Sequence, residues 1–214
     1  MSGVADAVTV IRGELRLVLS LRVLPARVAR FFWLARRRAS RSGDRFSLDS
    51  AARPAELAVL LALARDRTTV VELGTGTAWS AIALALDDRA RRVLSYDPCV
   101  RAEREAYLDL AGPRVRERID LREEPDSAGP REGDPPVQLL FIDSSHDRES
   151  VLGAFRAWRD ALAPGTVVVF HDHGHPYYPG VREAVAELEL SGQELGGLFV
   201  WRVPCSTTGT SRLC

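Results

Sequence analysis

The chain has 214 residues, enough for one sizeable α/β domain with an extension but not comfortably for two domains. Hydrophobic residues make up 46% of it and charged residues 27%, which excludes a largely disordered protein. The formal net charge is zero and every one of the 29 cations is arginine, so composition indicates no nucleic-acid partner and provides no lysine as a base or Schiff-base former.

Cysteine usage and hydropathy both bear on the cellular compartment. Cys99, Cys205 and Cys214 are widely spaced and form no Cys/His cluster, a pattern that predicts neither a zinc site nor a disulfide framework. No window approaches eighteen uncharged apolar residues, and the N-terminus lacks the pattern of a secretion signal. We therefore expect a cytoplasmic protein.

Residues 1–43 predict a basic amphipathic helical extension. Between Leu15 and Gly43 there are eight arginines and no carboxylate, interleaved with apolar residues and divided by Pro25. We expect helices that cap the main domain and a ligand pocket on it, with a homodimer contact as a further role. The alternative is a segment that lies on an anionic membrane surface, as basic amphipathic helices do.

Residues 44–203 alternate helical and strand patterns, and the polar tail 204–214 predicts a flexible end. Continuous apolar strands between helices predict a mostly parallel sheet covered on both faces. The expected helices span residues 54–64, 78–86, 101–110, 148–162 and 181–190. The expected strands span residues 69–73, 92–96, 138–142, 166–170 and 198–203, with another inside 115–122.

A glycine loop follows the first strand, in the run Glu72-Leu73-Gly74-Thr75-Gly76. Glycines let the backbone approach a ligand closely, and the start of the next helix offers unpaired N–H groups to an anion. The dinucleotide fingerprint would need a third glycine where Trp79 stands, so the loop fits a carboxylate better than a pyrophosphate. Glu72 can hold an ammonium group, and Asp97, after the next strand, is placed to bind ribose hydroxyls.

All four histidines follow two later strands, in Asp143-Ser144-Ser145-His146 and in His171-Asp172-His173-Gly174-His175. The carboxyl ends of parallel strands line the ligand crevice of such a sheet. Asp143, Asp172 and His173 therefore suit a divalent cation, with His171 as an alternative ligand. His146 is the candidate general base, because imidazole titrates near neutrality. We expect residues 171–180 to form a lid.

These motifs resemble those of the class I S-adenosylmethionine-dependent methyltransferases, over about residues 44–201. The likeness is strongest to the catechol O-methyltransferase type, in which an acidic-Leu-Gly turn precedes an aromatic–serine pair, here Trp79-Ser80. It implies a Rossmann-like α/β fold with a seven-stranded sheet. It also implies cofactor contacts, which fall on Glu72, Gly74, Thr75, Gly76, Ser80, Asp97, Asp143 and either Glu124 or Asp126.

The same resemblance implies a metal site. Relatives of this type bind magnesium through an Asp after the fourth strand and an Asp-Asn pair after the fifth, which correspond to Asp143, Asp172 and His173. Histidine in the Asn position favours a softer ion, so manganese, iron or zinc stands beside magnesium. The D-x-x-H spacing, which ends at His146, is similar to that of macrolide-sugar O-methyltransferases.

The predicted function is S-adenosylmethionine-dependent O-methylation of a small hydroxylated molecule, either a phenol or catechol or a sugar of a secondary metabolite. Two alternatives stay open. One is an iron-dependent hydroxylase built on the same fold. The other is a protein that binds S-adenosylmethionine or a membrane surface without turnover.

Overall fold

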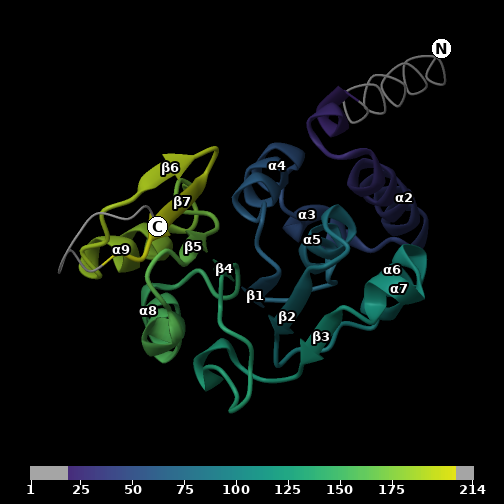
Figure 1. Ribbon diagram of the computed structural model, residues 1–214. Helices are drawn as coiled ribbons and strands as arrows, with labels where there is room; N and C mark the ends of the chain where they lie inside the picture. Colours follow the sequence, from purple (N-terminus) through teal and green to yellow (C-terminus); the bar gives the residue numbers. More distant parts are fainter. Residues whose placement is uncertain (1–18, 206–214) are drawn as a thin grey trace.

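The computed structural model describes residues 19–205, and its centre is a seven-stranded sheet in the order β3-β2-β1-β4-β5-β7-β6 (Figure 1). The first five strands along the chain run parallel. At one edge, β7 pairs antiparallel with β5, and β6 pairs antiparallel with β7. The strands are β1 (Thr69–Leu73), β2 (Arg92–Tyr96), β3 (Ile119–Arg122), β4 (Leu139–Ile142), β5 (Val167–Phe170), β6 (Gln193–Leu195) and β7 (Leu198–Arg202).

The helices cover both faces of this sheet. They are α2 (Ala26–Ser42), α3 (Arg45–Ser50), α4 (Pro54–Leu63), α5 (Trp79–Asp87), α6 (Arg104–Ala111), α7 (Pro113–Arg116), α8 (Arg148–Trp158) and α9 (Pro179–Glu187). Single 3-10 turns occur at Leu21–Val23 (η1), Asp126–Ala128 (η2) and Arg159–Ala161 (η3). In Figure 1, α4 and α5 lie on one side of the central strands and α8 lies on the other.

Alternation along the central strands explains the two layers. Val70 of β1 belongs to a buried cluster with α2, α4, α5 and α6, whereas its neighbour Val71 packs with α8 and α9. Successive side chains of a strand point to opposite faces, so a run of apolar residues fills both cores. The predicted α/β architecture, with its mostly parallel seven-stranded sheet, is confirmed.

Two short elements escaped the sequence pattern. Helix α3 has only six residues and is set by its cap, in which the carboxylate of Asp44 accepts from the backbone N–H of Ser47 at 2.9 Å. Strand β6 is exposed along its whole length, so it carries no apolar signal. Its pairing with β7 supplies the seventh strand.

Helix α2 packs its apolar side onto the main domain. Phe32 and Phe31 contact the ring of Trp79 edge-on, with centroids 5.3 and 6.4 Å apart, and Tyr107 of α6 closes the cluster 5.2 Å from Trp79. Such edge-to-face pairs stabilise aromatic cores beyond the burial of area alone. Residues 26–42 of the N-terminal segment thus pack on the main domain, while residues 1–18 lie outside the described part.

Two further observations concern the membrane and the cysteines. Within residues 19–205, no helix has the length and apolar character needed to cross a membrane.

Cys99 is a free, exposed cysteine. Cys205 is disulfide-bonded, which the wide cysteine spacing did not lead us to expect.

Candidate active site

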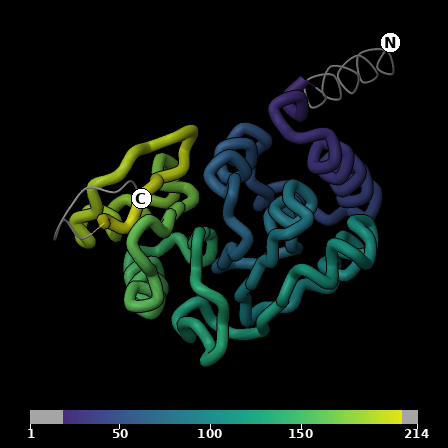
Figure 2. The backbone as a smooth tube through the Cα atoms, in the orientation of Figure 1, coloured from purple at the N-terminus to yellow at the C-terminus, as the bar shows by residue number. Residues whose placement is uncertain are grey.

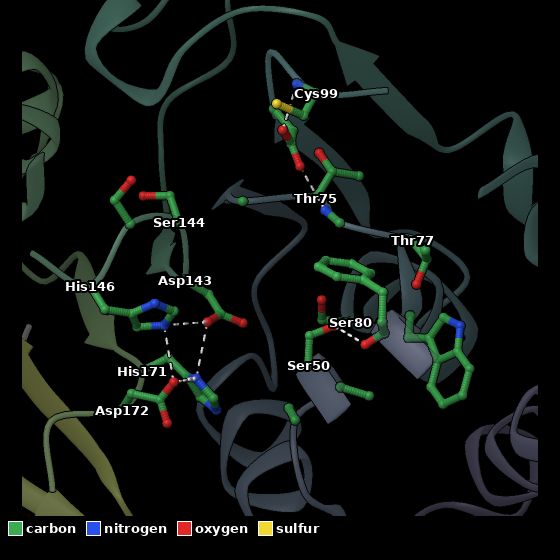
Figure 3. A pocket seen from close by; sticks show the side chains of 18 of the residues that line it. Ser50, Thr75, Thr77, Ser80, Cys99, Asp143, Ser144, His146, His171 and Asp172 are labelled. Carbon is green, nitrogen blue, oxygen red and sulfur yellow. Dashed lines mark hydrogen bonds and ion pairs between the residues drawn. The ribbon is translucent and has the colours of Figure 1, made fainter. Parts of the chain in front are cut away.

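A cavity of about 650 Å³ opens where β1, β2, β4 and β5 end. The loops after these four strands line one side of it, and α3 with the segment 51–56 lines the other. Figure 3 looks into this cavity, with Thr75 and Ser80 on one side and the group of Asp143, His146, His171 and Asp172 on the other. The glycine loop and the acid–histidine segments therefore share one space, as the strand order requires.

The glycine loop is pressed against the loop after β4. Gly74 has a φ of +100°, and a Cβ on it would lie 2.1 Å from the carbonyl oxygen of Asp143. The Asp143 N–H donates to the carbonyl of Leu73 at 2.8 Å, which locks the two loops together. Only glycine meets both the left-handed backbone conformation and this contact.

Asp97 lies beside the glycine loop and already binds it. Its carboxylate accepts from the backbone N–H groups of Gly76 and Cys99, each at 2.8 Å. The buried guanidinium of Arg104 lies 3.7 Å from the same carboxylate and donates to the carbonyls of Gly76 and Cys99. Arg104, which the sequence analysis missed, thus ties Asp97 to the loop. The sequence does not single out Arg104, because most arginines on helices are exposed and a buried one looks the same in sequence.

Glu72 is fully buried beneath the loop and does not line the cavity surface. The hydroxyl of Ser95 donates to its Oε2 at 2.5 Å, while Oε1 has no hydrogen-bond partner. Burial raises the pKa of Glu72 to about 7, although hydrogen bonds from Ser80 and Ser95 act in the opposite direction. An unpartnered buried carboxylate oxygen fits a site that is completed by a ligand cation.

The loop after β3 carries Glu124 and Asp126, of which the resemblance implied that one contacts the cofactor. Glu124 is outside the cavity lining and forms an ion pair with Arg131 at 2.7 Å. Asp126 lines the cavity and accepts from the Ser144 hydroxyl at 2.5 Å. Of this pair, Asp126 is therefore the one placed to meet a ligand.

Four side chains from the loops after β4 and β5 converge. One ligand-type atom from each of Asp143, His146, His171 and Asp172 lies within 4.8 Å of the other three. His171 Nδ1 is 2.9 Å from Asp143 Oδ1 and 3.1 Å from Asp172 Oδ2, and His146 Nε2 is 3.0 Å from Asp172 Oδ2. Asp172 has a φ of +55°, an uncommon conformation for a residue with a side chain, and such strain concentrates at functional sites.

The other side of His171 faces Glu56 of α4, which the sequence analysis did not select. Its Nε2 lies 3.4 Å from Glu56 Oε2, and both side chains are buried. Burial by itself lowers the pKa of His171, but Asp143, Asp172 and Glu56 outweigh it and raise the pKa to about 12. The position of Glu56 at the start of a helix is typical of a capping residue, which is why the sequence did not single it out. Glu56 does act as a cap, because it accepts from the N–H of Arg53 at 2.8 Å.

The geometry of this cluster fits a divalent cation. His146 Nε2 and His171 Nδ1 are buried and close to carboxylate oxygens, yet neither meets the angles of a hydrogen bond. The ring nitrogens thus face a shared space rather than a single partner. The contact between Glu56 and His171 Nε2 adds the carboxylate that usually orients a metal-binding imidazole.

His173, predicted as the third ligand, lies apart from this cluster. Its ring stacks on Phe199 of β7 with centroids 4.9 Å apart, and its Nδ1 is 3.6 Å from Glu194 of β6. His171, the alternative ligand, lies in the cluster with Asp143, His146 and Asp172. The resemblance placed the ligand one residue beyond Asp172, but after the left-handed conformation at Asp172 the side chain of His173 packs against β7 and β6.

The predicted lid, residues 171–180, contributes an aromatic wall. Tyr178 is stacked between His146 and His175, at centroid distances of 4.2 and 4.6 Å. A Cβ on Gly180 would lie 2.6 Å from the carbonyl oxygen of His146, so the two loops touch through their backbones. His175 and Tyr178 line the cavity, whereas Tyr177 is largely exposed and outside the lining.

Helix α2 does not reach this cavity. None of its residues is among the lining residues, so residues 26–42 do not form the pocket wall that we expected from the N-terminal segment. The cavity wall on this side comes from α3 and the turn after it, through Phe46, Ser50 and Ala51. Phe46 is held by the guanidinium of Arg101, 3.7 Å from the ring centroid, across the cavity mouth.

Comparison with known protein families agrees with the glycine loop and the acid–histidine cluster. Residues 71–173 match the family model described as a methyltransferase domain. The matched range begins inside β1 and ends just beyond β5, so it includes both motifs. Among curated proteins, none matches the sequence significantly.

Solved structures extend the likeness to the rest of the fold. The O-methyltransferase TomG of Streptomyces achromogenes, solved with S-adenosylmethionine, is 20% identical with a TM-score of 0.59, over 73% of this chain and 83% of that one. An O-methyltransferase of Bacillus cereus, solved with S-adenosylhomocysteine, is 15% identical with a TM-score of 0.64, over 84% and 91%. CalS11, a TDP-rhamnose 3'-O-methyltransferase, is 19% identical with a TM-score of 0.55, over 68% and 77%.

Residues 71–173 thus match a methyltransferase domain, and the chain has the fold of the S-adenosylmethionine-dependent O-methyltransferases.

Proposed function

We propose that this enzyme transfers a methyl group from S-adenosylmethionine to a hydroxyl of a small molecule, with the help of a divalent cation. A single observation carries the proposal: the glycine loop and the cluster of Asp143, His146, His171 and Asp172 line the same cavity. One part of that cavity fits a charged nucleoside, and the other fits a cation with its oxygen ligand.

The cofactor would occupy the side of the glycine loop. Glu72 would pair with the ammonium group through its unpartnered oxygen, and Ser80 with the loop N–H groups would hold the methionine carboxylate. Asp97 would hold the ribose hydroxyls and Asp126 the adenine end. Bound there, S-adenosylmethionine would supply the methyl group of its sulfonium, and S-adenosylhomocysteine would be the leaving group.

The cation would be held by Asp143, Asp172 and His171, with Glu56 orienting the His171 ring. Two carboxylates with one or two imidazoles suit magnesium, manganese, iron or zinc, and we favour magnesium or manganese for a methyl transfer. The chemistry that such a cation would supply is a lower pKa of a bound hydroxyl and neutralisation of the charge that develops on its oxygen.

His146 would accept the proton of the acceptor hydroxyl. Its ring lines the cavity and lies against Tyr178, and its Nε2 faces the position between the two aspartates. The remaining task of the chain is positioning, because methyl transfer needs the oxygen and the methyl carbon in line. His146 could instead be a fourth ligand of the cation. Metal affinity separates the two roles, because it falls in His146→Ala only if the ring binds the cation.

The deciding experiment is calorimetric titration of the chelator-treated protein with S-adenosylhomocysteine, alone and with magnesium or manganese. We expect micromolar binding of S-adenosylhomocysteine, and metal binding that is lost in the double variant Asp143→Ala/Asp172→Ala. Absence of S-adenosylhomocysteine binding under every metal condition would overturn the proposal. A positive result leads to a methylation screen over catechols, other phenols and sugar hydroxyls of secondary metabolites.

A second candidate is an iron-dependent hydroxylase, favoured by one observation. Two histidines and two aspartates converge, and two imidazoles with a carboxylate are a donor set of non-haem Fe(II). Anaerobic reconstitution with Fe(II), followed by a test for oxygen-dependent product, separates the two candidates. The proposal also includes a cytoplasmic location and a homodimer, which cell fractionation and analytical ultracentrifugation test directly.

A further inference from the structure

The outer side of helix α2 carries a stripe of arginines. Arg27, Arg30, Arg37, Arg38 and Arg41 recur at spacings of three or four residues or stand side by side, so they share one side of the helix. The apolar residues Val28, Phe31, Phe32, Ala35 and Ala39 occupy the other side and are buried in the core. Helix α2 runs along the outer edge of the molecule, drawn in purple in Figure 2.

No carboxylate of the described residues neutralises this stripe. Residues 19–43 contain no Asp or Glu, and no ion pair joins any of the five arginines to a carboxylate within residues 19–205. The first acidic residue after the helix, Asp44, is buried, and its carboxylate is engaged by Ser47 and by the Tyr107 hydroxyl at 2.6 Å. A chain of zero net charge thus concentrates positive charge on one helix about 25 Å long.

Apolar side chains interrupt the stripe. Trp33 and Leu34 are half-buried between the arginines, and the Arg37 guanidinium lies 4.7 Å from the centroid of the Trp33 ring. In the residues that precede α2 along the chain, Leu19 is 48% exposed and Val23 is 56% exposed. Arginine side chains with an aromatic and several aliphatic groups between them match a lipid headgroup region, where the charges meet phosphates and the apolar groups enter the interface.

We propose that the outer side of α2 docks this protein on an anionic phospholipid surface. The phosphates would neutralise the five arginines, while Leu19, Val23 and the exposed edge of Trp33 would enter the headgroup layer. RNA offers the same phosphate charge, but it has no apolar layer for Leu19 and Val23, which precede the stripe along the chain. The apolar side of α2 stays in the protein core, so docking requires no unfolding of the helix.

The test is co-sedimentation of the full chain with vesicles of phosphatidylcholine, with and without 30% phosphatidylglycerol (about a third, chosen to give a strongly negative surface). We expect binding only to the anionic vesicles, and a loss of binding as salt rises. In the stripe variant, the fraction bound falls at least about tenfold, since each basic residue near such a surface contributes to the affinity. The stripe variant combines R27Q, R30Q, R37Q, R38Q and R41Q.

A matched control neutralises five exposed arginines elsewhere, and it should bind like the native chain. It combines R65Q, R89Q, R92Q, R114Q and R159Q, none of which forms an ion pair among the described residues. The pair Leu19→Ser and Val23→Ser keeps the charge and should weaken vesicle binding severalfold. Binding of S-adenosylhomocysteine, unchanged by each substitution, verifies that the variants fold.

Three results would overturn the proposal. The first is equal sedimentation of the native chain with neutral and anionic vesicles, or with neither. The second is an equal loss in the stripe variant and in the matched control, which would reduce the effect to net charge. The third is tight binding to a single-stranded RNA oligonucleotide that survives Leu19→Ser/Val23→Ser, which would make the stripe a nucleic-acid surface.

Discussion

The imidazole of His171 bridges two layers of the fold. Its Nε2 lies 3.4 Å from Glu56 at the start of α4, and its Nδ1 lies 2.9 Å from Asp143 at the end of β4. One ring thus connects the first turn of α4 to the acid–histidine cluster. An imidazole held by a carboxylate on one nitrogen presents the other nitrogen in a fixed direction, which is the usual arrangement behind a metal ligand.

The first prediction follows from this bridge. Glu56→Gln should weaken manganese binding by about 10- to 100-fold, because loss of a carboxylate behind a ligating histidine has effects of this size. The amide oxygen can still cap α4, so we expect little change in the free energy of unfolding. Glu187→Gln, on the surface of α9, is the control. Manganese titration followed by electron paramagnetic resonance measures both; equal affinity in Glu56→Gln and native protein would remove Glu56 from the site.

The second prediction concerns Asp97, which joins the glycine loop to the β2 end. Asp97→Ala should weaken binding of S-adenosylhomocysteine by at least about tenfold, since hydrogen bonds to a charged group contribute about 1.5–3 kcal/mol. Metal binding should be unchanged, because Asp97 is not in the acid–histidine cluster. The exposed Asp109→Ala on α6 serves as the control. Calorimetry that finds native affinity in Asp97→Ala contradicts a ribose-binding role.

The third prediction concerns His146 and the ring that stacks on it. With any acceptor found by screening, His146→Ala should lower kcat more than it raises KM, and higher pH should partly restore the rate as the acceptor ionises by itself. Tyr178→Phe keeps the stacked ring and should be nearly native, whereas Tyr178→Leu should lose activity in part. A pH–rate profile that is the same in His146→Ala and the native enzyme would exclude His146 as the base.

The fourth prediction uses the pKa of Glu72, which is about 7 in the fold and about 4.5 when unperturbed. Because the folded state binds this proton more tightly than the unfolded chain, protonated Glu72 stabilises the fold. The contribution is fully present below pH 4.5, and it is lost as pH rises from 4.5 to 7. The free energy of unfolding should therefore fall from pH 4.5 to 7 relative to Glu72→Gln, by on the order of 3 kcal/mol. Urea unfolding of both proteins at pH 5 and pH 8 measures this difference.

Binding gives Glu72 a second signature. A ligand ammonium favours the ionised carboxylate, so S-adenosylhomocysteine should bind the native protein more tightly at pH 8 than at pH 6. Glu72→Gln should bind weakly and lose much of this dependence. Identical pH dependence of binding in the two proteins would separate Glu72 from the ammonium site.

The fifth prediction compares two glycines with positive φ. Gly74→Ala introduces both backbone strain and a clash with the Asp143 carbonyl, so it should destabilise the protein by several kcal/mol and disturb cofactor and metal binding together. Gly43→Ala, where nothing lies within 4 Å, should cost only about 1 kcal/mol. Thermal unfolding of both variants checks the difference; equal costs would mean that the loop contact at Gly74 is easily relaxed.

The sequence carried most of the fold and one half of the site. The runs at 69–73 and 139–142 are fully buried, and buried strands leave a strong apolar signal that fixes both their positions and the loops that follow. The acidic and glycine residues after them could therefore be assigned to one crevice. The exposed strand β6 and the short helix α3 left no such signal, because pairing and a single cap define them.

Tertiary structure decided which groups meet. The choice of His171 over His173 depends on the left-handed turn at Asp172, and the choice of Asp126 over Glu124 depends on how the loop after β3 folds back. Glu56 stands 115 residues from His171, and Arg104 stands 28 residues from Gly76 of the glycine loop, so no local pattern relates these pairs. Apolar periodicity fixed the order of elements, whereas long-range packing fixed the direction of each polar side chain. For this reason the sequence by itself determined where the crevice lies and which kinds of side chain follow its strands. Only the tertiary structure determined which of those side chains lie together in the cavity.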